Sequence, residues 1–157
     1  MVSERAEVAS SRDLERARRY EHVTLARLFD RHYDAVHGFI FALLSDTVAA
    51  EEIASLVFQR LLDALGTIGG RGAGIEGWIF ATALDLAGQR KRPSRPQSLA
   101  GALWGLPARE REVLALRLLA GLDLDRVGSA TGLEAGAVLA TQARALKRLS
   151  TQMVGRR

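Results

Sequence analysis

Residues 103–149 carry the pattern that decides the fold: "LWGLPAREREVLALRLLAGLDLDRVGSATGLEAGAVLATQARALKRL". Pro107 suits the first position of a helix, because the N–H that proline lacks would have no partner there. Residues 123–131 and 134–152 form two further helical segments that meet at Gly132, a residue type that commonly ends helices. The stretch therefore predicts a helix–turn–helix pair.

The sequence before this stretch also has the period of helices, and strand patterns are scarce. Between residues 25 and 44 apolar side chains recur every third or fourth position, and the spacing returns in residues 53–65. The tripeptide Ser-Asp-Thr at 45–47 separates these two helices and offers a cap for the second. A further helix is expected over residues 76–92. The sequence thus predicts an all-α fold.

The best domain boundary is the segment "PSRPQS", because its two prolines stop helices and favour an extended backbone. We expect a flexible N-terminal segment (1–21), a first helical domain (22–92), a short linker (93–98) and a second helical domain (99–157). A G-x-G-x-x-G pattern ends at Gly77, but a dinucleotide-binding fingerprint requires a preceding strand. A long helical pattern precedes it instead, so we interpret this stretch as a connector.

Composition excludes several classes of protein. The 157 residues contain no cysteine, which rules out a disulfide framework and a thiolate metal site. The longest apolar run, "FIFALL" at 39–44, is far too short for a membrane span. The first residues mix charges and lack the apolar core of a secretory signal, so we expect a cytoplasmic protein.

The sequence offers little chemistry for catalysis. The closest histidines, His32 and His37, are five positions apart and do not share a helical face, which argues against a metal pair. No P-loop and no local arrangement for an activated nucleophile is visible. We therefore expect no enzyme, no catalytic residue, no metal and no cofactor.

Positive charge is concentrated in two places. The chain has a formal net charge of +4, yet residues 90–95 and 144–157 are rich in lysine and arginine and contain no acid. The remainder of the chain is consequently acidic. Such clusters are typical of contact with phosphates or with an acidic partner, and a solvated linker and tail are an equally good reading of charge alone.

Four motifs, in order along residues 25–150, resemble the extracytoplasmic-function type of bacterial RNA polymerase sigma factor. They are "LFDRHYDAVHGFIFALLSD" (28–46), "AAEEIASLVFQRLL" (49–62), "GWIFATALDLAGQRKR" (77–92) and the opening stretch (103–149). The resemblance implies a bundle like sigma region 2 followed by a helix–turn–helix domain like region 4. It also implies binding to the polymerase core and to promoter DNA.

In the second motif, which in the family docks on the polymerase clamp, the resemblance assigns polymerase binding to five residues: Glu51, Glu52, Ser55, Leu56 and Phe58. The family's Gln-Glu pair falls on Ser55 and Leu56, which removes hydrogen bonds and one charge. The motif therefore permits polymerase docking but does not by itself establish it.

The third motif resembles the helix that meets the −10 promoter element. The family's Asn falls on Asp85, which as a carboxylate only accepts hydrogen bonds and is repelled by phosphates. We expect Trp78 to pack in the core rather than to stack on bases. Arg90, Lys91 and Arg92 are expected to contact DNA phosphates.

The last helix occupies the position of a DNA-recognition helix but lacks side chains that could recognise bases. The family's Gly-Thr-Val-Lys-Ser-Arg falls on residues 136–141, Gly-Ala-Val-Leu-Ala-Thr, which offer no bidentate base contact. Helical spacing places Ala135, Val138, Leu139, Gln142, Leu146, Leu149 and Met153 on the packing side. DNA contacts are expected from the opposite side, by Thr141, Arg144, Lys147 and Arg148, mainly to phosphates.

Two functional hypotheses follow. The first is a sigma-factor-like regulator with weak sequence readout of its own. The second is an adaptor or decoy that binds an anti-sigma factor or another DNA-binding regulator, favoured by the bare reading helix and by a linker that spans at most about 20 Å. An unrelated helix–turn–helix repressor acting as a dimer is a third possibility.

Overall fold

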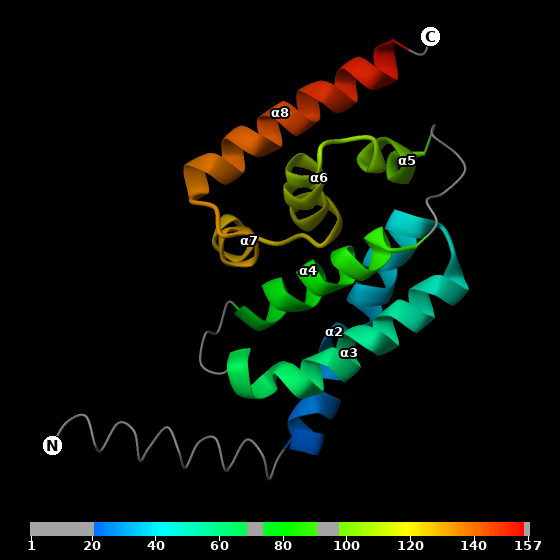
Figure 1. The fold of residues 1–157 in the computed structure, drawn as a ribbon, viewed down its shortest axis with the longest axis vertical. Coiled ribbons are helices and arrows are strands. Elements are labelled where there is room, and N and C mark those ends of the chain that lie inside the picture. The colour runs from blue at the N-terminus through cyan, green and yellow to red at the C-terminus, as the bar shows by residue number, and fades with distance from the viewer. Residues whose placement is uncertain (1–20, 69–73, 91–97, 156–157) are drawn as a thin grey trace, which may run out of the picture.

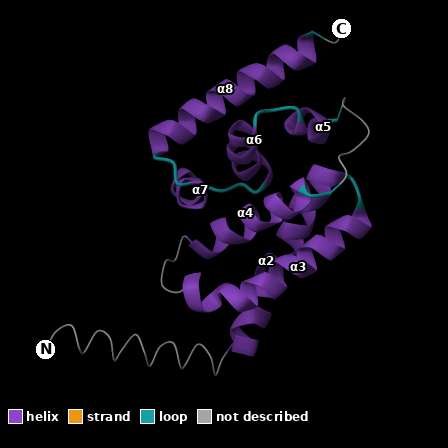
Figure 2. Ribbon diagram, in the orientation of Figure 1, coloured by secondary structure: helices purple, strands orange, loops and turns teal. Residues whose placement is uncertain are grey.

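The computed structural model describes residues 21–68, 74–90 and 98–155, and in these ranges every regular element is a helix (Figures 1 and 2). The all-α prediction is therefore confirmed. The first group comprises α2 (Glu21–Leu44), α3 (Thr47–Ile68) and α4 (Gly74–Gly88). The second comprises α5 (Leu99–Trp104), α6 (Ala108–Leu114), the π-helical turn η1 (Ala115–Leu119), α7 (Leu124–Thr131) and α8 (Ala135–Val154). The boundaries proposed at 92–93 and 98–99 stay a prediction, because residues 91–97 lie outside the described ranges.

The first group forms around a tight reversal between α2 and α3. Ser45 adopts a left-handed backbone with φ of 54°, and the Asp46 carboxylate accepts a hydrogen bond from Ala49 N at 3.0 Å. This cap on α3 is the one expected from the Ser-Asp-Thr break. The rings of Phe39 in α2 and Phe80 in α4 meet edge to face, with centroids 5.3 Å apart. The buried core of this group also contains Val36, Ile40, Leu43, Ile53, Val57, Leu61, Ile79 and Ala83.

The second group contains the predicted helix–turn–helix. Asp123 caps α7 by accepting from Arg126 N at 2.9 Å, and Gly132 ends it in a left-handed conformation with φ of 74°. The turn into α8 is tight, since a Cβ added to Gly128 would lie 2.8 Å from the carbonyl oxygen of Leu133. These glycines fix the direction in which α8 leaves the turn.

The helix expected to begin at Pro107 is interrupted. After Leu114 the backbone widens into η1, where Ala120 N donates to Ala115 O at 3.1 Å, five residues back. Arg117 in this turn donates to Leu122 O at 3.1 Å and to Gln142 Oε1 at 2.9 Å. The wider turn thereby ties α6 to α8.

The two groups pack on each other with α4 between them (Figure 1). The indole Nε1 of Trp104, in α5, donates to Leu43 O at 2.8 Å in a buried contact. This carbonyl is among the last four of α2, which have no partner within the helix. On the other side, a Cβ added to Gly77 of α4 would lie 3.2 Å from Ala130 Cβ of α7. The close approach favours glycine at position 77, because a larger residue would have to push α7 away by a few tenths of an ångström.

Trp104→Phe tests the contact at the end of α2. The substitution keeps most of the ring but leaves the buried Leu43 carbonyl without its donor, so we expect a loss of about 1–3 kcal/mol in unfolding free energy, measured by urea denaturation. Trp78→Phe is the matched control, because Trp78 is only partly buried and donates no side-chain hydrogen bond within the described residues. Equal losses in the two variants would show that the hydrogen bond contributes nothing specific.

Candidate nucleic-acid and protein interfaces

The basic residues of α8 surround a buried acid. Glu110, in the first turn of α6, is 6% exposed, and the exposed side chains of Arg144 and Arg148 lie over it. Arg148 Nε lies 3.0 Å from Oε2 and 3.2 Å from Oε1 of Glu110, and Arg144 Nε lies 3.9 Å from Oε1. A buried carboxylate needs such partners. Part of the positive charge on α8 is consequently offset within the protein.

Lys147 differs from its two basic neighbours. Its side chain is exposed and forms no ion pair with any other described residue. Lys147 therefore offers its full charge to an external anion, whereas Arg148 has to share or leave Glu110 in order to bind a phosphate.

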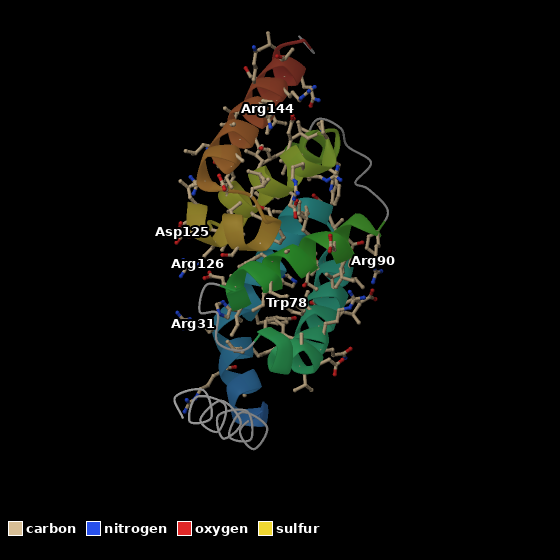
Figure 3. The ribbon with its side chains drawn as sticks, turned by 60° about the vertical axis from the view of Figure 1, so that its left-hand side comes forward. Arg31, Trp78, Arg90, Asp125, Arg126 and Arg144 are labelled. Atoms are coloured by element: carbon tan, nitrogen blue, oxygen red, sulfur yellow. The ribbon has the colours of Figure 1, made fainter. Side chains whose placement is uncertain are left out.

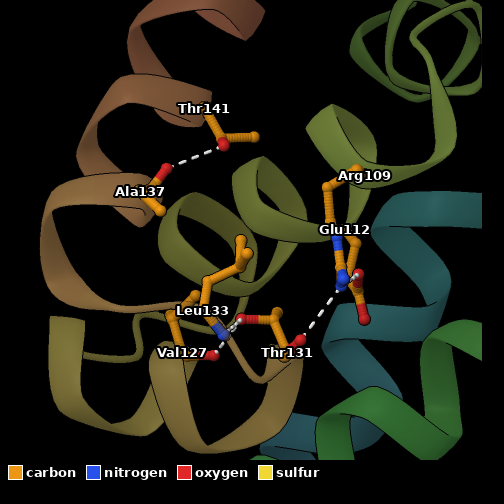
Figure 4. Close-up of polar contacts among 7 residues, drawn as sticks. All are labelled: Arg109, Glu112, Val127, Thr131, Leu133, Ala137 and Thr141. Carbon is orange, nitrogen blue, oxygen red and sulfur yellow. Dashed lines mark hydrogen bonds and ion pairs between the residues drawn. The ribbon is translucent and has the colours of Figure 1, made fainter.

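Thr141 does not lie with these residues on the outer side of α8. It is 3% exposed, and its hydroxyl donates to Ala137 O at 2.7 Å (Figure 4). Arg144 Nη2 donates to the same hydroxyl at 3.1 Å. Its expected position on the DNA side of the helix is wrong, because α8 packs on α6 and α7 through a different face. That face consists of Val138, Thr141, Ala145 and Leu149. Two leucines and one methionine that were expected on the packing side are exposed instead: Leu139, Leu146 and Met153.

The second candidate basic cluster begins at the end of α4. Arg90 Nη2 donates to the Glu52 carboxylate of α3 at 2.8 Å, and both side chains are about half exposed (41% and 53%). This contact joins a residue expected to bind DNA to one expected to bind polymerase. Lys91 and Arg92 lie outside the described residues. Figure 3 shows Arg90 and Arg144 well separated, so these arginines do not form one patch.

The expected polymerase-binding residues line two different surfaces of α3. Glu51, Glu52, Ser55 and Leu56 are exposed, whereas Phe58 is 4% exposed. Its ring packs edge to face on Phe29 and is tilted against Tyr33, with centroid distances of 5.1 and 6.2 Å. A groove of about 410 Å³ runs between the two helices over this aromatic cluster. Its lining consists of Ala26, Phe29, Asp30, Ser55, Phe58, Gln59 and Leu62.

Sequence reasoning missed several residues of this groove. Gln59 and Leu62 continue the spacing of Ser55 along one face of α3, and that spacing is the signal that could have identified them. Phe29 comes from α2, and its 39% exposure could not be inferred from an apolar position in a helical stripe. The groove thus combines an apolar floor with the acidic rim residue Asp30.

The side of α4 that carries Asp85 faces the second group. Asp85 lines a pocket of about 340 Å³ together with Trp104, Arg109, Arg111 and Glu112. The Arg111 guanidinium lies 4.9 Å from the centre of the Trp104 ring and donates to Trp104 O and Leu106 O, so it holds α5 against α6. Arg109 ties α6 to the end of α7 by donating to Thr131 O at 3.0 Å (Figure 4).

A further ionic contact closes the seam between α4 and α7. Arg126 Nε lies 3.1 Å from Glu76 Oε2, beside the Gly77 contact.

Burial lowers the pKa of His32 in α2, and the nearby Glu76 carboxylate partly opposes this effect. His32 is therefore neutral at pH 7. In the described ranges no cluster of three or more potential metal ligands occurs, and no helix is long and apolar enough to cross a membrane.

Comparison with known proteins identifies relatives of both the sequence and the fold. Residues 102–151 match the family model "Sigma-70, region 4". The chain is 25% identical to the ECF RNA polymerase sigma factor BldN of Streptomyces coelicolor, over 87% of this chain and 63% of that protein. A shorter stretch of 49 residues, 31% of this chain and 23% of the relative, is 45% identical to the ECF RNA polymerase sigma factor SigD of Mycobacterium tuberculosis. The chain thus spans less than two thirds of the length of either relative.

Among solved structures, the fold is similar to that of CnrH in complex with the cytosolic domain of CnrY. The TM-score is 0.71 at 20% identity, and the alignment covers 94% of this chain and 96% of that chain. Both helical groups are included in this likeness of fold. Residues 102–151 are therefore similar to sigma-70 region 4, and the larger part of the chain is similar in sequence to an extracytoplasmic-function RNA polymerase sigma factor.

Proposed function

We propose that the protein is a cytoplasmic, non-enzymatic transcription regulator that binds the RNA polymerase core and contacts promoter DNA mainly through phosphates. The observation that carries this proposal is the region 4 match at residues 102–151 in a chain that also aligns with a sigma factor over 87% of its length. The domain division expected from the sequence, 22–92 and 99–157, is part of the proposal.

The polymerase contact is assigned to the outer side of α3 and the groove beside it. Glu51, Glu52, Ser55 and Leu56 are exposed there, and Phe58 forms the floor of the groove. Phe29 and Leu62 are 39% and 36% exposed, which leaves an apolar surface for a partner side chain between acidic residues. A partner with apolar anchors and basic flanks would suit this surface.

The DNA contact is assigned to two basic clusters. Arg144, Lys147 and Arg148 lie along α8, and Arg90 begins the second cluster, which Lys91 and Arg92 continue in the sequence. Phosphate contacts position a protein on DNA but carry no sequence information. Since residues 135–141 provide no arginine, asparagine or glutamine, we expect strong salt dependence and little preference among sequences.

A specific observation favours the second candidate function, an adaptor or decoy. Gly77 of α4 packs on α7 and Leu84 is buried, so part of the helix that resembles the −10 reader is covered, whereas Asp85 is exposed. In this arrangement the protein presents the groove and the surface of α3 while its candidate −10 surface is partly covered. An anti-sigma factor or another regulator would be the partner of such a molecule.

Leu62→Arg tests the polymerase contact. A charged side chain in the apolar groove should weaken binding of the full chain to purified core polymerase by about tenfold or more, measured by biolayer interferometry. Val48→Arg is the matched control, because Val48 is 64% exposed on the same helix and does not line the groove. Absence of core binding by the unaltered chain would exclude the first function and leave the adaptor.

Lys147→Ala and Glu110→Gln test the DNA contact in opposite directions. Removing Lys147 should weaken binding to duplex DNA of any sequence and lower the salt slope by about one. Glu110→Gln should strengthen binding, because Arg148 and Arg144 lose the carboxylate that offsets their charge. Arg60→Ala removes one exposed charge from α3 and should leave binding unchanged. The readout is fluorescence anisotropy with labelled duplexes at several salt concentrations, and a strong preference for one sequence would contradict the proposed weak readout.

A further inference from the structure

An apolar stripe runs along the exposed side of α8. Leu139, Leu146 and Met153 are 47%, 42% and 69% exposed, and they follow one another at intervals of seven residues. Ala143 and Ser150, also exposed, fill the positions between them. This alternation of three and four residues is the spacing with which a helix presents a continuous seam to another helix.

The stripe is not used by the fold of the chain itself. α8 packs on α6 and α7 through Val138, Thr141, Ala145 and Leu149, which lie on an adjacent face. At the border between the two faces, Gln142 is held by Arg117. The stripe therefore remains as surface after the domain has closed its own core.

The chemistry of the stripe does not suit DNA. Leu139 falls where the sigma-factor motif has lysine, and Ala140 where it has serine, so a positive and a polar group are both replaced by apolar ones. Leucine and methionine bring neither charge nor hydrogen bonds to a phosphate backbone, whose contacts depend on both. Burying these apolar side chains against another protein is therefore more favourable in free energy than placing them beside DNA.

The stripe has the shape that a helix requires. Large side chains at 139, 146 and 153 alternate with the small residues Gly136, Ala143 and Ser150. A Cβ added to Gly136 would have no neighbour within 4 Å, so this end of the seam is open. Small residues allow a second helix to approach closely, and the large ones can insert between its side chains.

The charge of α8 indicates which kind of helix would bind to the stripe. Residues 135–155 contain no acid, and Lys147, next to Leu146 along the chain, has no ion-pair partner among the described residues. A second copy of α8 laid along this seam would bring like charges together. An acidic flank would instead complement Lys147, which lies beside the seam.

We propose that the stripe of Leu139, Ala143, Leu146, Ser150 and Met153 is the docking seam for an acidic, amphipathic α-helix of another protein. The helix that corresponds by position to a DNA-recognition helix would thus bind another protein. This inference goes beyond the proposed function, since it requires neither polymerase nor promoter, and Leu62→Arg, which tests the polymerase contact, should leave the seam unaffected.

The test uses the full chain and a fluorescein-labelled synthetic peptide of three heptads, with leucine at the a and d positions and glutamate at the flanking e and g positions. We expect saturable binding by fluorescence anisotropy that weakens with salt, and weakening by about tenfold or more in Leu146→Gln. Val48→Gln, an exposed apolar residue on α3, is the control and should bind the peptide as the unaltered chain does. A peptide with lysine at the flanks should bind at least about tenfold more weakly than the glutamate peptide.

Several results would overturn the proposal. They are absence of peptide binding, equal binding by Leu146→Gln, and equal binding of the lysine-flanked peptide. A dimer of the unaltered chain in sedimentation that Leu146→Gln dissolves would identify a second copy as the occupant. A loss of duplex DNA binding in Leu146→Gln that matches its loss of peptide binding would assign the stripe to DNA. Circular dichroism of each variant establishes that it is folded, which an exposed leucine on the helix surface should permit.

Discussion

The arrangement of the two helical groups depends on α4, because its apolar side chains must be buried on more than one side of the helix. A helix with one apolar face can pack on a single neighbour, but the buried residues of α4 include Ile79, Phe80, Leu84 and Leu86, which point in different directions around its axis. The α2–α3 pair covers only part of this surface. The second group covers more of it, mainly through α7, so the hydrophobic effect favours the closed arrangement of the two groups.

This constraint places structural stability and promoter access in competition. A promoter strand that reached α4 would have to displace the contacts that bury Gly77 and Leu84 and the ion pair between Arg126 and Glu76. The same competition operates on a smaller scale in α8, where Glu110 holds the guanidinium groups that phosphates would otherwise attract. In both places the protein supplies its own partner for a surface that is proposed to contact nucleic acid. A molecule built in this way suits protein partners that bind it closed.

Local features were predictable from the sequence, because they rest on neighbouring residues. The cap at Asp46, the left-handed Gly132 and the helix–turn–helix all follow from residue types at fixed offsets. The π-helical turn was not predictable, since it preserves the apolar pattern of a helix while changing its hydrogen bonds. Nor was the buried face of α8, because apolar residues cover a wide arc of that helix and only the position of α6 decides which of them are covered. The Arg148–Glu110 and Trp104–Leu43 contacts join residues 38 and 61 positions apart, a separation that one sequence cannot reveal.

Trp104 gives this closed arrangement an optical signature. The chain has two tryptophans, and they lie in different surroundings: Trp104 is 6% exposed at the junction of the two groups, whereas Trp78 is partly buried in the first group. Separation of the groups would move the Trp104 indole from a dry site with a fixed hydrogen bond into water. The emission of that one residue would shift to longer wavelength, so the native protein carries its own spectroscopic reporter of opening.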